Sequence, residues 1–397
     1  MAQEKLLSGC AAAAQGAKFA EVEVVCSYPI RPYTAIMMEL AKLVANGELD
    51  AEFIHGEGEH AQVSVVLGAS ACGARAYTGS SGVGVTYAFE VYSPAAGGRY
   101  PLQRAIADRT LDPPGDFGSE HTDCMSARDQ GWLMSWAATP QEVFDNTLIN
   151  YRVGEDPKIM LPQFVAQDGY FLSHIPDKVI LPDLAQVREF LPPYSAPHPL
   201  SPTCPVSHGP QIRPDQGAPM DAQRAMTFID LPPVIEKAVS DYNRIFGRNI
   251  DPWLEKFMMD DAEVAFFIQG AHANTCKSAI RHLRTQGLKA GMVRPRWVRP
   301  WPTQQISDAL ANAKAVACVE TSTSYGGATR GGNLIHEVSA SLYDLDKRPL
   351  LTSFMAGLGG DVILLDDFYY MAKILKQMVE EKKTRQKVYW VGFEDEA

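Results

Sequence analysis

Apolar positions follow two different periods along this chain, and the two periods alternate. In the first half, short β-branched runs typical of strands are each followed by a stretch with helical spacing. The strand-like runs are residues 22–26, 51–54 and 75–78, and the helical stretches are residues 6–17, residues 59–74 and one that begins at Thr34. Regular alternation of this kind predicts an α/β protein with a mainly parallel sheet and helices on both faces.

The second half of the chain begins with a break in this pattern. Residues 191–219 are rich in proline, serine and histidine and have neither period, so we expect an extended surface connection there. A helical stretch at residues 234–246 follows. Further strands are expected at residues 264–268, 291–294 and 315–320, and further helices at residues 275–286, after Trp301 and within residues 368–382. We therefore predict two domains, residues 1–250 and residues 251–397.

Composition narrows the classes of function. The chain has 397 residues, a formal net charge of -11 and a pI near 5.3. Nucleic acid and anionic membranes both attract basic surfaces, so neither is expected as a partner. We find no secretory leader and no run of about 18 apolar residues, and we expect a cytoplasmic protein. The cysteines are odd in number and widely separated, which predicts reduced, mostly buried thiols; they are Cys10, Cys26, Cys72, Cys124, Cys204, Cys276 and Cys318.

Several chemically suggestive motifs have structural interpretations. The loop at residues 79–84 runs Gly-x-x-Gly-x-Gly, which is not the dinucleotide-binding fingerprint. His60, His121 and His174 lack metal-ligand spacing and are interpreted as structural histidines. Arginines and tryptophans interleave at residues 294–301, and in an acidic chain we expect this cluster at an interdomain or subunit surface.

Four short motifs, taken together and in this order, say more about the class of protein. They are Tyr-Pro-Ile-Arg-Pro at residues 28–32, Gly-Glu-Gly-Glu-His at residues 56–60, Gly-Ala-Arg-Ala at residues 73–76, and Asp-Gly at residues 168–169 followed by Ser-His at residues 173–174. In this combination the chain resembles the α subunit of thiamine-diphosphate-dependent 2-oxoacid:ferredoxin oxidoreductases. The segments at residues 189–194 and 261–302 also fit, so the resemblance covers nearly the whole chain.

The resemblance implies a division of labour between subunits. The α chain of that family carries a pyrimidine-type thiamine diphosphate domain and a transketolase-C-terminal-like domain. A partner β chain holds the diphosphate and Mg²⁺, partner subunits hold [4Fe-4S] clusters, and electrons pass to ferredoxin. The sequence agrees by omission, because it has no Gly-Asp-Gly with a downstream Asn for the metal and no cysteine spacing for a cluster. We expect this chain to be active only with its partners.

Glu59 matches the family glutamate that faces N1′ of the aminopyrimidine, where a carboxyl group favours the imino form that removes the C2 proton. Its neighbour Glu57 could be confused with it, but Glu59 begins the small-residue helix. The alternative is a first-turn glutamate that only complements the helix dipole. The resemblance also implies cofactor contacts from Pro29, Ser81 and Gly82.

Arg109 matches the family arginine that grips the carboxylate of the 2-oxoacid. A forked guanidinium suits a carboxylate because two parallel hydrogen bonds fix both charge and orientation. The alternative is a surface salt bridge with Asp108 or Asp112.

Arg31 departs from the family motif, which usually reads Tyr-Pro-Ile-Thr-Pro with the threonine facing substrate. If Arg31 and Arg109 point into one pocket, the site offers two cations, more than a single carboxylate needs. Oxalate is the compact dianion that would use both, and each charge pair near 4 Å is worth roughly 4 kcal/mol before desolvation. The alternative is that Arg31 swings outward to pair with an acid.

The segment at residues 111–121 differs from the usual family wording and combines paired prolines with two glycines. Loops of this build often gate sites. We hypothesise that Asp112 approaches the substrate and promotes loss of CO₂, and that Phe117 shields the pocket from water. A simple acidic turn with structural prolines is the alternative.

The residues and the resemblance together predict one subunit of an oxidoreductase that converts oxalate to two CO₂ and passes electrons through partner clusters to ferredoxin. Another 2-oxoacid, such as pyruvate or phenylglyoxylate, is the nearest alternative. A non-catalytic scaffold that helps to close a partner's active site is the alternative from a different class.

Overall fold

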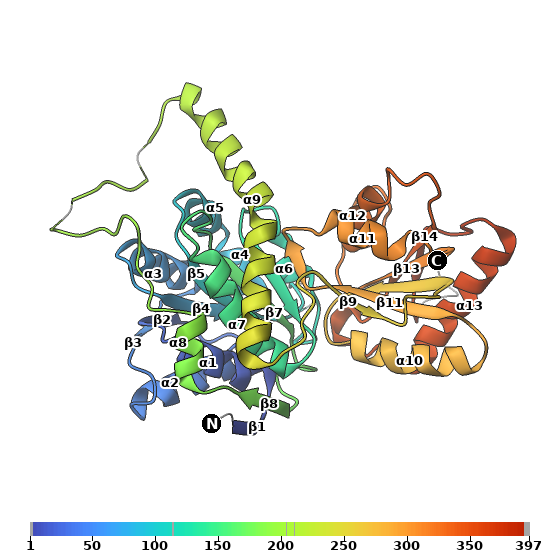
Figure 1. The fold of residues 1–397 in the computed structure, drawn as a ribbon, viewed down its shortest axis with the longest axis horizontal. Coiled ribbons are helices and arrows are strands. Elements are labelled where there is room, and N and C mark those ends of the chain that lie inside the picture. The colour runs from blue at the N-terminus through green and yellow to red at the C-terminus, as the bar shows by residue number, and fades with distance from the viewer. Residues whose placement is uncertain (1–2, 113–114, 204, 210, 393–397) are drawn as a thin grey trace.

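The computed structural model describes residues 3–112, 115–203, 205–209 and 211–392. These residues form two α/β units that lie side by side, each built on its own sheet (Figure 1). The predicted fold class is therefore confirmed. One long helix, α9 (Pro214–Phe246), lies along the first unit and projects beyond it (Figure 1).

The first unit is built on a seven-stranded sheet. In spatial order its strands are β12 (Trp297–Arg299), β6 (Leu133–Ala137), β7 (Gln163–Asp168), β5 (Leu102–Asp108), β4 (Ala76–Ser80), β2 (Val24–Ser27) and β3 (Glu52–His55). All neighbouring pairs are parallel except β12 with β6. The central strand β5 is buried along its whole length, as expected for a parallel sheet covered on both faces.

Helices surround this sheet. They are α1 (Gly9–Phe19), α2 (Thr34–Ala45), α3 (Glu59–Ala71), α4 (Val83–Tyr87), α5 (Phe89–Gly97), α6 (Thr122–Ser126), α7 (Pro140–Gly154), α8 (Leu184–Phe190) and α9. Small residues allow the closest approach between them. A Cβ on Gly16 of α1 would come within 2.7 Å of the Thr147 side chain of α7, so alanine and glycine on α1 bring the two helices together.

The second unit has a six-stranded sheet. In spatial order its strands are β15 (Val388–Trp390), β14 (Leu350–Met355), β13 (Ala315–Glu320), β10 (Val264–Ile268), β11 (Ala290–Pro295) and β9 (Leu254–Phe257), all parallel except β9. Its helices are α10 (Ala273–Thr285), α11 (Thr303–Leu310), α12 (Leu334–Ser341) and α13 (Leu365–Glu381), with a short 3₁₀ turn at Leu358–Gly360. The strands predicted at residues 264–268 and 315–320 are confirmed with the same bounds.

The predicted starts of two helices are wrong. The first helix begins at Gly9 because Gln3–Leu7 forms a strand, β1, which pairs with β8 (Asp177–Leu181). Helix α9 begins at Pro214, well before residue 234, so residues 214–219 are helical and not an extended connection. Internal prolines had indicated a break, but buried side chains at helical spacing keep one face of α9 packed on the first unit.

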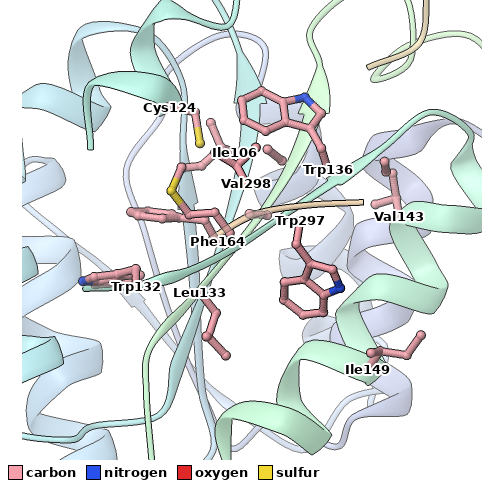
Figure 2. Packing of buried hydrophobic residues seen from close by; sticks show 14 of the residues in the cluster. Ile106, Cys124, Trp132, Leu133, Trp136, Val143, Ile149, Phe164, Trp297 and Val298 are labelled. Atoms are coloured by element: carbon pink, nitrogen blue, oxygen red, sulfur yellow. The ribbon is translucent and has the colours of Figure 1, made fainter. Parts of the chain in front are cut away.

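A short return strand joins the two units. Strand β12 follows β11 of the second unit, yet it pairs antiparallel with β6 of the first. Figure 2 shows Trp297 and Val298 of β12 among buried residues of the first unit, including Trp136 and Phe164. The Trp297 indole donates a hydrogen bond to the carbonyl of Pro252 over 3.1 Å. The chain therefore re-enters the first unit after a boundary near residue 250, which stays a prediction.

Buried charge also joins the units, where the arginine–tryptophan cluster was expected at an interface. Arg294 is fully buried, and its guanidinium donates to Glu142 of α7 and to Glu255 of β9, each over 2.6 Å. Arg296 reaches the same carboxyl of Glu142 over 2.8 Å. The two arginines hold the pKa of Glu142 at about 2 despite its burial. The cluster is thus an interdomain surface.

Among the cysteines within the described ranges, none forms a disulfide, and all except Cys72 are buried. Burial raises the pKa of the Cys26 thiol to about 11, so it is inert near neutral pH. Cys204 lies outside the described residues. No helix in residues 3–112, 115–203, 205–209 and 211–392 is both long and apolar enough to cross a membrane.

Candidate active site

The predicted site residues gather at the carboxyl edge of the first sheet. Arg31 follows β2, Glu59 follows β3, Ser81 and Gly82 follow β4, and Arg109 follows β5. Because carboxyl ends of parallel strands share one edge, loops that are far apart in sequence meet there.

Glu59 is the first residue of α3 and is only 5 % exposed. Its carboxyl group lies against Gly84, where a Cβ would overlap both that carboxyl and the hydroxyl of Ser80. Glycine at position 84 is therefore needed for Glu59 to reach this place. Glu57, the neighbour that could be confused with it, is exposed. The geometry favours Glu59 over Glu57 as the residue that faces a bound ring.

Arg109 is buried, with 5 % of its surface exposed. Its Nη1 donates a hydrogen bond to the main-chain carbonyl of Arg31 over 3.1 Å. Its Nε lies so close to Gly82 that a Cβ there would come within 2.6 Å, and Gly82 itself has a positive φ of 53°. Gly82 therefore allows both the turn and the approach of Arg109.

The residues predicted around Arg109 do come together. Asp112 Oδ2 lies 3.6 Å from an Arg109 Nη2, and the Asp112 side chain is 41% exposed. The guanidinium carbon of Arg109 lies over the Phe117 ring, 5.2 Å from the ring centroid, and Phe117 is 67% exposed. Asp112 and Phe117 of the loop at residues 111–121 thus lie beside Arg109, and contact of this loop with substrate stays a prediction. Pro113 and Pro114 lie outside the described residues.

The side chain of Arg31 is exposed, and it has no ion-pair partner within the described part of the chain. The alternative of an outward ion pair is therefore not observed. Its loop is docked on the next one: the Tyr33 amide donates to Ser81 Oγ over 3.1 Å, and the Tyr33 ring fills the space beside Gly79. Pro29 is exposed at the tip of the same loop. The convergence of the two guanidinium groups stays a prediction.

Asp123 is a site residue that sequence reasoning missed. It is fully buried in α6, and its Oδ2 accepts hydrogen bonds from the amides of Gly82 over 2.7 Å and Arg109 over 3.0 Å. Its Oδ1 accepts from the amide of Cys124 over 2.6 Å. Its signal in the sequence was only an aspartate two residues after His121, which nothing tied to the loops it holds.

A buried arginine, Arg104, also contacts the segment that contains Gly82 and Gly84. Arg104 in β5 is fully buried; it donates to the hydroxyl of Tyr92 and, over 3.1 Å, to the carbonyl of Gly84. Its guanidinium carbon lies 5.4 Å from the Tyr92 ring centroid. Arg104 thus fixes the peptide that packs on Glu59.

Asp168 and His121 connect the site to the second unit. His121 Nε2 lies 2.9 Å from Asp168 Oδ1, and the amide of Ala271 donates to Asp168 Oδ2 over 2.7 Å. The His121 amide donates to the carbonyl of Thr321 over 2.9 Å. Asp168 ends β7, while Ala271 and Thr321 follow β10 and β13, so the carboxyl edges of the two sheets face each other here.

The other predicted histidines have structural partners. His60 lies 3.2 Å from Glu90, and His174 Nδ1 lies 2.7 Å from Ser173 Oγ. Within the described ranges, no group of three or more histidine, cysteine, aspartate or glutamate side chains is arranged to hold a metal ion.

Two family models match the chain. Residues 15–240 match the model described as "Pyruvate flavodoxin/ferredoxin oxidoreductase, thiamine diP-bdg", and residues 262–368 match "Pyruvate:ferredoxin oxidoreductase core domain II". The pyruvate synthase subunit PorA of Pyrococcus abyssi is 34% identical over 388 residues, which cover 97% of each chain. The ketoisovalerate oxidoreductase subunit VorA of the same organism is 32% identical, covering 98% of this chain and 97% of that one.

Solved structures share the fold. The 2-oxoglutarate:ferredoxin oxidoreductase from Magnetococcus marinus superposes with a TM-score of 0.71 and 17% identity, covering 95% of this chain and 65% of that chain. A split-gene transketolase gives a TM-score of 0.52 and 12% identity, with 94% and 97% covered. At these identities the likeness concerns the fold alone.

Fold, site and matches define an α/β oxidoreductase chain with a thiamine-diphosphate-binding domain. More particularly, the chain belongs to the 2-oxoacid:ferredoxin oxidoreductase family, as an α-type subunit.

Proposed function

We propose that this chain forms the aminopyrimidine side of a thiamine diphosphate site, in a complex that oxidises a small 2-oxoacid and passes the electrons to ferredoxin. Thiamine diphosphate, when bound, supplies the carbon nucleophile for this chemistry. The observation that carries the proposal is the buried carboxyl of Glu59, seated against Gly84 at the carboxyl edge of the sheet. The residues present therefore suit the pyrimidine half of the cofactor.

In this proposal Glu59 holds or releases a proton at N1′ of the ring. Glu59 is the first residue of α3, and its burial keeps water from competing for the proton. Pro29, Ser81 and Gly82 remain the proposed contacts of the ring, because their two loops are joined by the hydrogen bond from Tyr33 to Ser81.

Arg109 is the proposed partner of the substrate carboxylate. Its Nη2 lies 3.6 Å from Asp112 Oδ2, beyond the length of a strong charge-assisted hydrogen bond, about 2.8 Å. Nη2 is therefore the donor left for a ligand. The half-exposed Asp112 is the group that such a ligand would displace.

The relatives favour a 2-oxoacid with one carboxylate as substrate. Their printed names refer to pyruvate synthase and ketoisovalerate oxidoreductase. A short 2-oxoacid such as pyruvate is therefore the first candidate.

Oxalate is the second candidate, and local residues favour it. Arg31 is an exposed cation whose carbonyl contacts the guanidinium of Arg109, where the resembling family has a neutral threonine. A dianion gains more from a second cation than pyruvate does, because it carries twice the charge. Asp112 and Phe117 lie beside Arg109, where they could act on so short a substrate.

The proposal extends to partners and place. A β subunit would hold the diphosphate and Mg²⁺, and [4Fe-4S] clusters on partner subunits would carry electrons to ferredoxin. We retain the division into domains 1–250 and 251–397 and a cytoplasmic location as proposals.

The test is a substrate panel with the reconstituted complex and a viologen dye as electron acceptor. Oxalate, pyruvate, 2-ketoisovalerate and phenylglyoxylate are each supplied with and without coenzyme A. Reduction of the dye by any one of them supports the proposed function. Reduction by oxalate without coenzyme A selects the second candidate, since its product is CO₂ and not an acyl thioester. Dye reduction that survives Glu59→Ala and Arg109→Ala would instead support the non-catalytic scaffold.

A further inference from the structure

We propose that Asp123 is a positioning residue that fixes the cofactor loop and the substrate arginine relative to each other through one carboxylate oxygen. The inference rests on the proposed function, because it assigns Gly82 to the cofactor and Arg109 to the substrate. Asp123 touches neither group itself. It acts through the hydrogen bonds that it accepts from the main-chain amides of Gly82 and Arg109.

One oxygen of Asp123 accepts hydrogen bonds from residues that follow two neighbouring strands. Oδ2 of Asp123 accepts from the amide of Gly82, after β4, and from the amide of Arg109, after β5, over 2.7 Å and 3.0 Å. Any shift of one loop relative to the other must lengthen one of these bonds. The side chain of Arg109 also packs on Gly82. The position of the Gly82 loop relative to the Arg109 main chain therefore sets the position of the guanidinium.

Both oxygens of Asp123 are committed as acceptors. Oδ1 accepts from the Cys124 amide over 2.6 Å, and the whole side chain is buried. An asparagine at position 123 can keep its oxygen on the Gly82 and Arg109 amides by turning its NH₂ group toward the Cys124 amide. Alanine removes both oxygens, so Asp123→Ala releases both loops and leaves their buried amides without this acceptor.

A second buried carboxyl, Asp108, lies next to Asp123. Within the described residues, neither oxygen of Asp108 accepts a hydrogen bond. Burial and the charges of Asp123 and Asp168 raise the pKa of Asp108 well above its usual range. Burial also raises the pKa of Asp123, to about 6, against the hydrogen bonds from Arg109 and Gly82. Asp108 therefore holds neither loop amide, whereas Asp123 holds both.

The two aspartates are therefore unequal. Asp108 accepts from neither loop, so Asp108→Ala should perturb the loops much less than Asp123→Ala. A merely structural role for the buried pair predicts equal losses from the two changes. Asp145 supplies a matched control, because it is a buried aspartate in α7 that accepts from Gln141 and Tyr242 over 2.8 Å and 2.7 Å, away from this edge.

The experiment uses the assembled complex with each variant and three readouts: the Kd for thiamine diphosphate, the KM and kcat with the substrate that the wild type accepts, and amide hydrogen exchange. We expect Asp123→Ala to raise both Kd and KM by at least about tenfold, with exchange at Gly82 and Arg109 accelerated together. Asp145→Ala should lower the unfolding temperature but leave Kd and KM within about threefold. Equal effects of Asp123→Ala and Asp108→Ala, or acceleration at only one of the two amides, would overturn the inference.

Exchange in the wild type keeps the inference testable if Asp123→Ala fails to assemble. Because the two amides share one acceptor, the protection factors of Gly82 and Arg109 should lie within about tenfold of each other. A larger difference contradicts the shared anchor. A wild-type complex that binds no thiamine diphosphate would count against the proposed function and leave the exchange result standing.

Discussion

The guanidinium of Arg109 donates a hydrogen bond to the main-chain carbonyl of Arg31 over 3.1 Å. The residue expected to bind the substrate carboxylate therefore contacts the backbone of the residue that departs from the family motif. The side chain of Arg31 itself is exposed. We propose that its charge meets a second anionic group on the substrate.

We predict that Arg31→Thr lowers kcat/KM for oxalate by about 10- to 100-fold and leaves that for pyruvate within about threefold. A hydrogen bond to a charged group contributes about 1.5 to 3 kcal/mol, and only a dianion would use this one. The measurement is steady-state dye reduction by the complex with both substrates. Arg31→Lys should lose less because it keeps the charge, and Arg213→Thr, at the exposed N-cap position before α9, is the matched control. An unchanged ratio between the two substrates would remove the charge argument for oxalate.

Replacing Asp112 with Ala should separate binding from turnover. Loss of the partner at 3.6 Å frees Arg109, so KM for a carboxylate substrate should fall. If Asp112 promotes loss of CO₂, kcat should fall by about 10- to 100-fold at the same time. Asp116→Asn is the control, because an amide oxygen can still accept from the Gly118 amide as Asp116 does. Normal turnover of Asp112→Ala would return the loop to its simpler interpretation as an acidic turn.

The return strand β12 should contribute several kcal/mol to the free energy of unfolding. Trp297 is 3% exposed and packs within the core shown in Figure 2. Trp297→Ala should lower the free energy of unfolding by about 3 to 5 kcal/mol, as large core truncations do. Urea titration followed by far-UV circular dichroism measures it. Trp390→Ala, which removes a tryptophan that is 37% exposed, should cost much less, and equal losses would contradict the anchoring role of β12.

Glu320 should make the second unit more stable at mildly acidic pH. Burial raises its pKa to about 7, against hydrogen bonds from the Leu334 amide and Ser353. The folded protein therefore holds this proton more tightly than the unfolded chain, whose glutamate has a pKa near 4.5. Between pH 4.5 and 7 the contribution falls as pH rises, by up to about 1.4 kcal/mol per unit.

Unfolding midpoints at pH 5 and pH 7.5 test the titration of Glu320. The wild type should lose more stability across this interval than Glu320→Gln, which cannot titrate. Glu381→Gln removes an exposed glutamate on α13 and should retain the wild-type difference. A Glu320→Gln variant with an undiminished pH dependence would show that another group is responsible.

The alternation of strand and helix patterns was sufficient to predict the architecture. Runs such as residues 264–268 are apolar throughout because helices cover both faces of a parallel sheet, and that signal is local. The start of α9 was missed because its prolines resemble a break, while the contacts that stabilise it come from distant segments. The position of β12 could not be predicted either, since three residues carry too little pattern to assign a partner strand.

Some site residues could likewise be predicted from the sequence and others could not. Glu59 and Arg109 stand in motifs that can be matched residue by residue, so their places could be predicted. Asp123 could not be, because its function depends on bringing together amides from two other loops. The geometry of Arg31 also depends on three dimensions, since its contact with Arg109 uses the carbonyl and not the side chain.

The most direct test of the proposed thiamine chemistry is the turnover number of Glu59→Gln in the assembled complex, measured as substrate-dependent dye reduction at saturating cofactor. Glutamine keeps the shape of the side chain but cannot exchange a proton at the ring, so kcat should fall by at least about 100-fold. Glu57→Gln, at the exposed neighbouring position, should retain wild-type turnover. A Glu59→Gln complex that turns over within about twofold of the wild type would contradict the placement of the cofactor against this carboxyl.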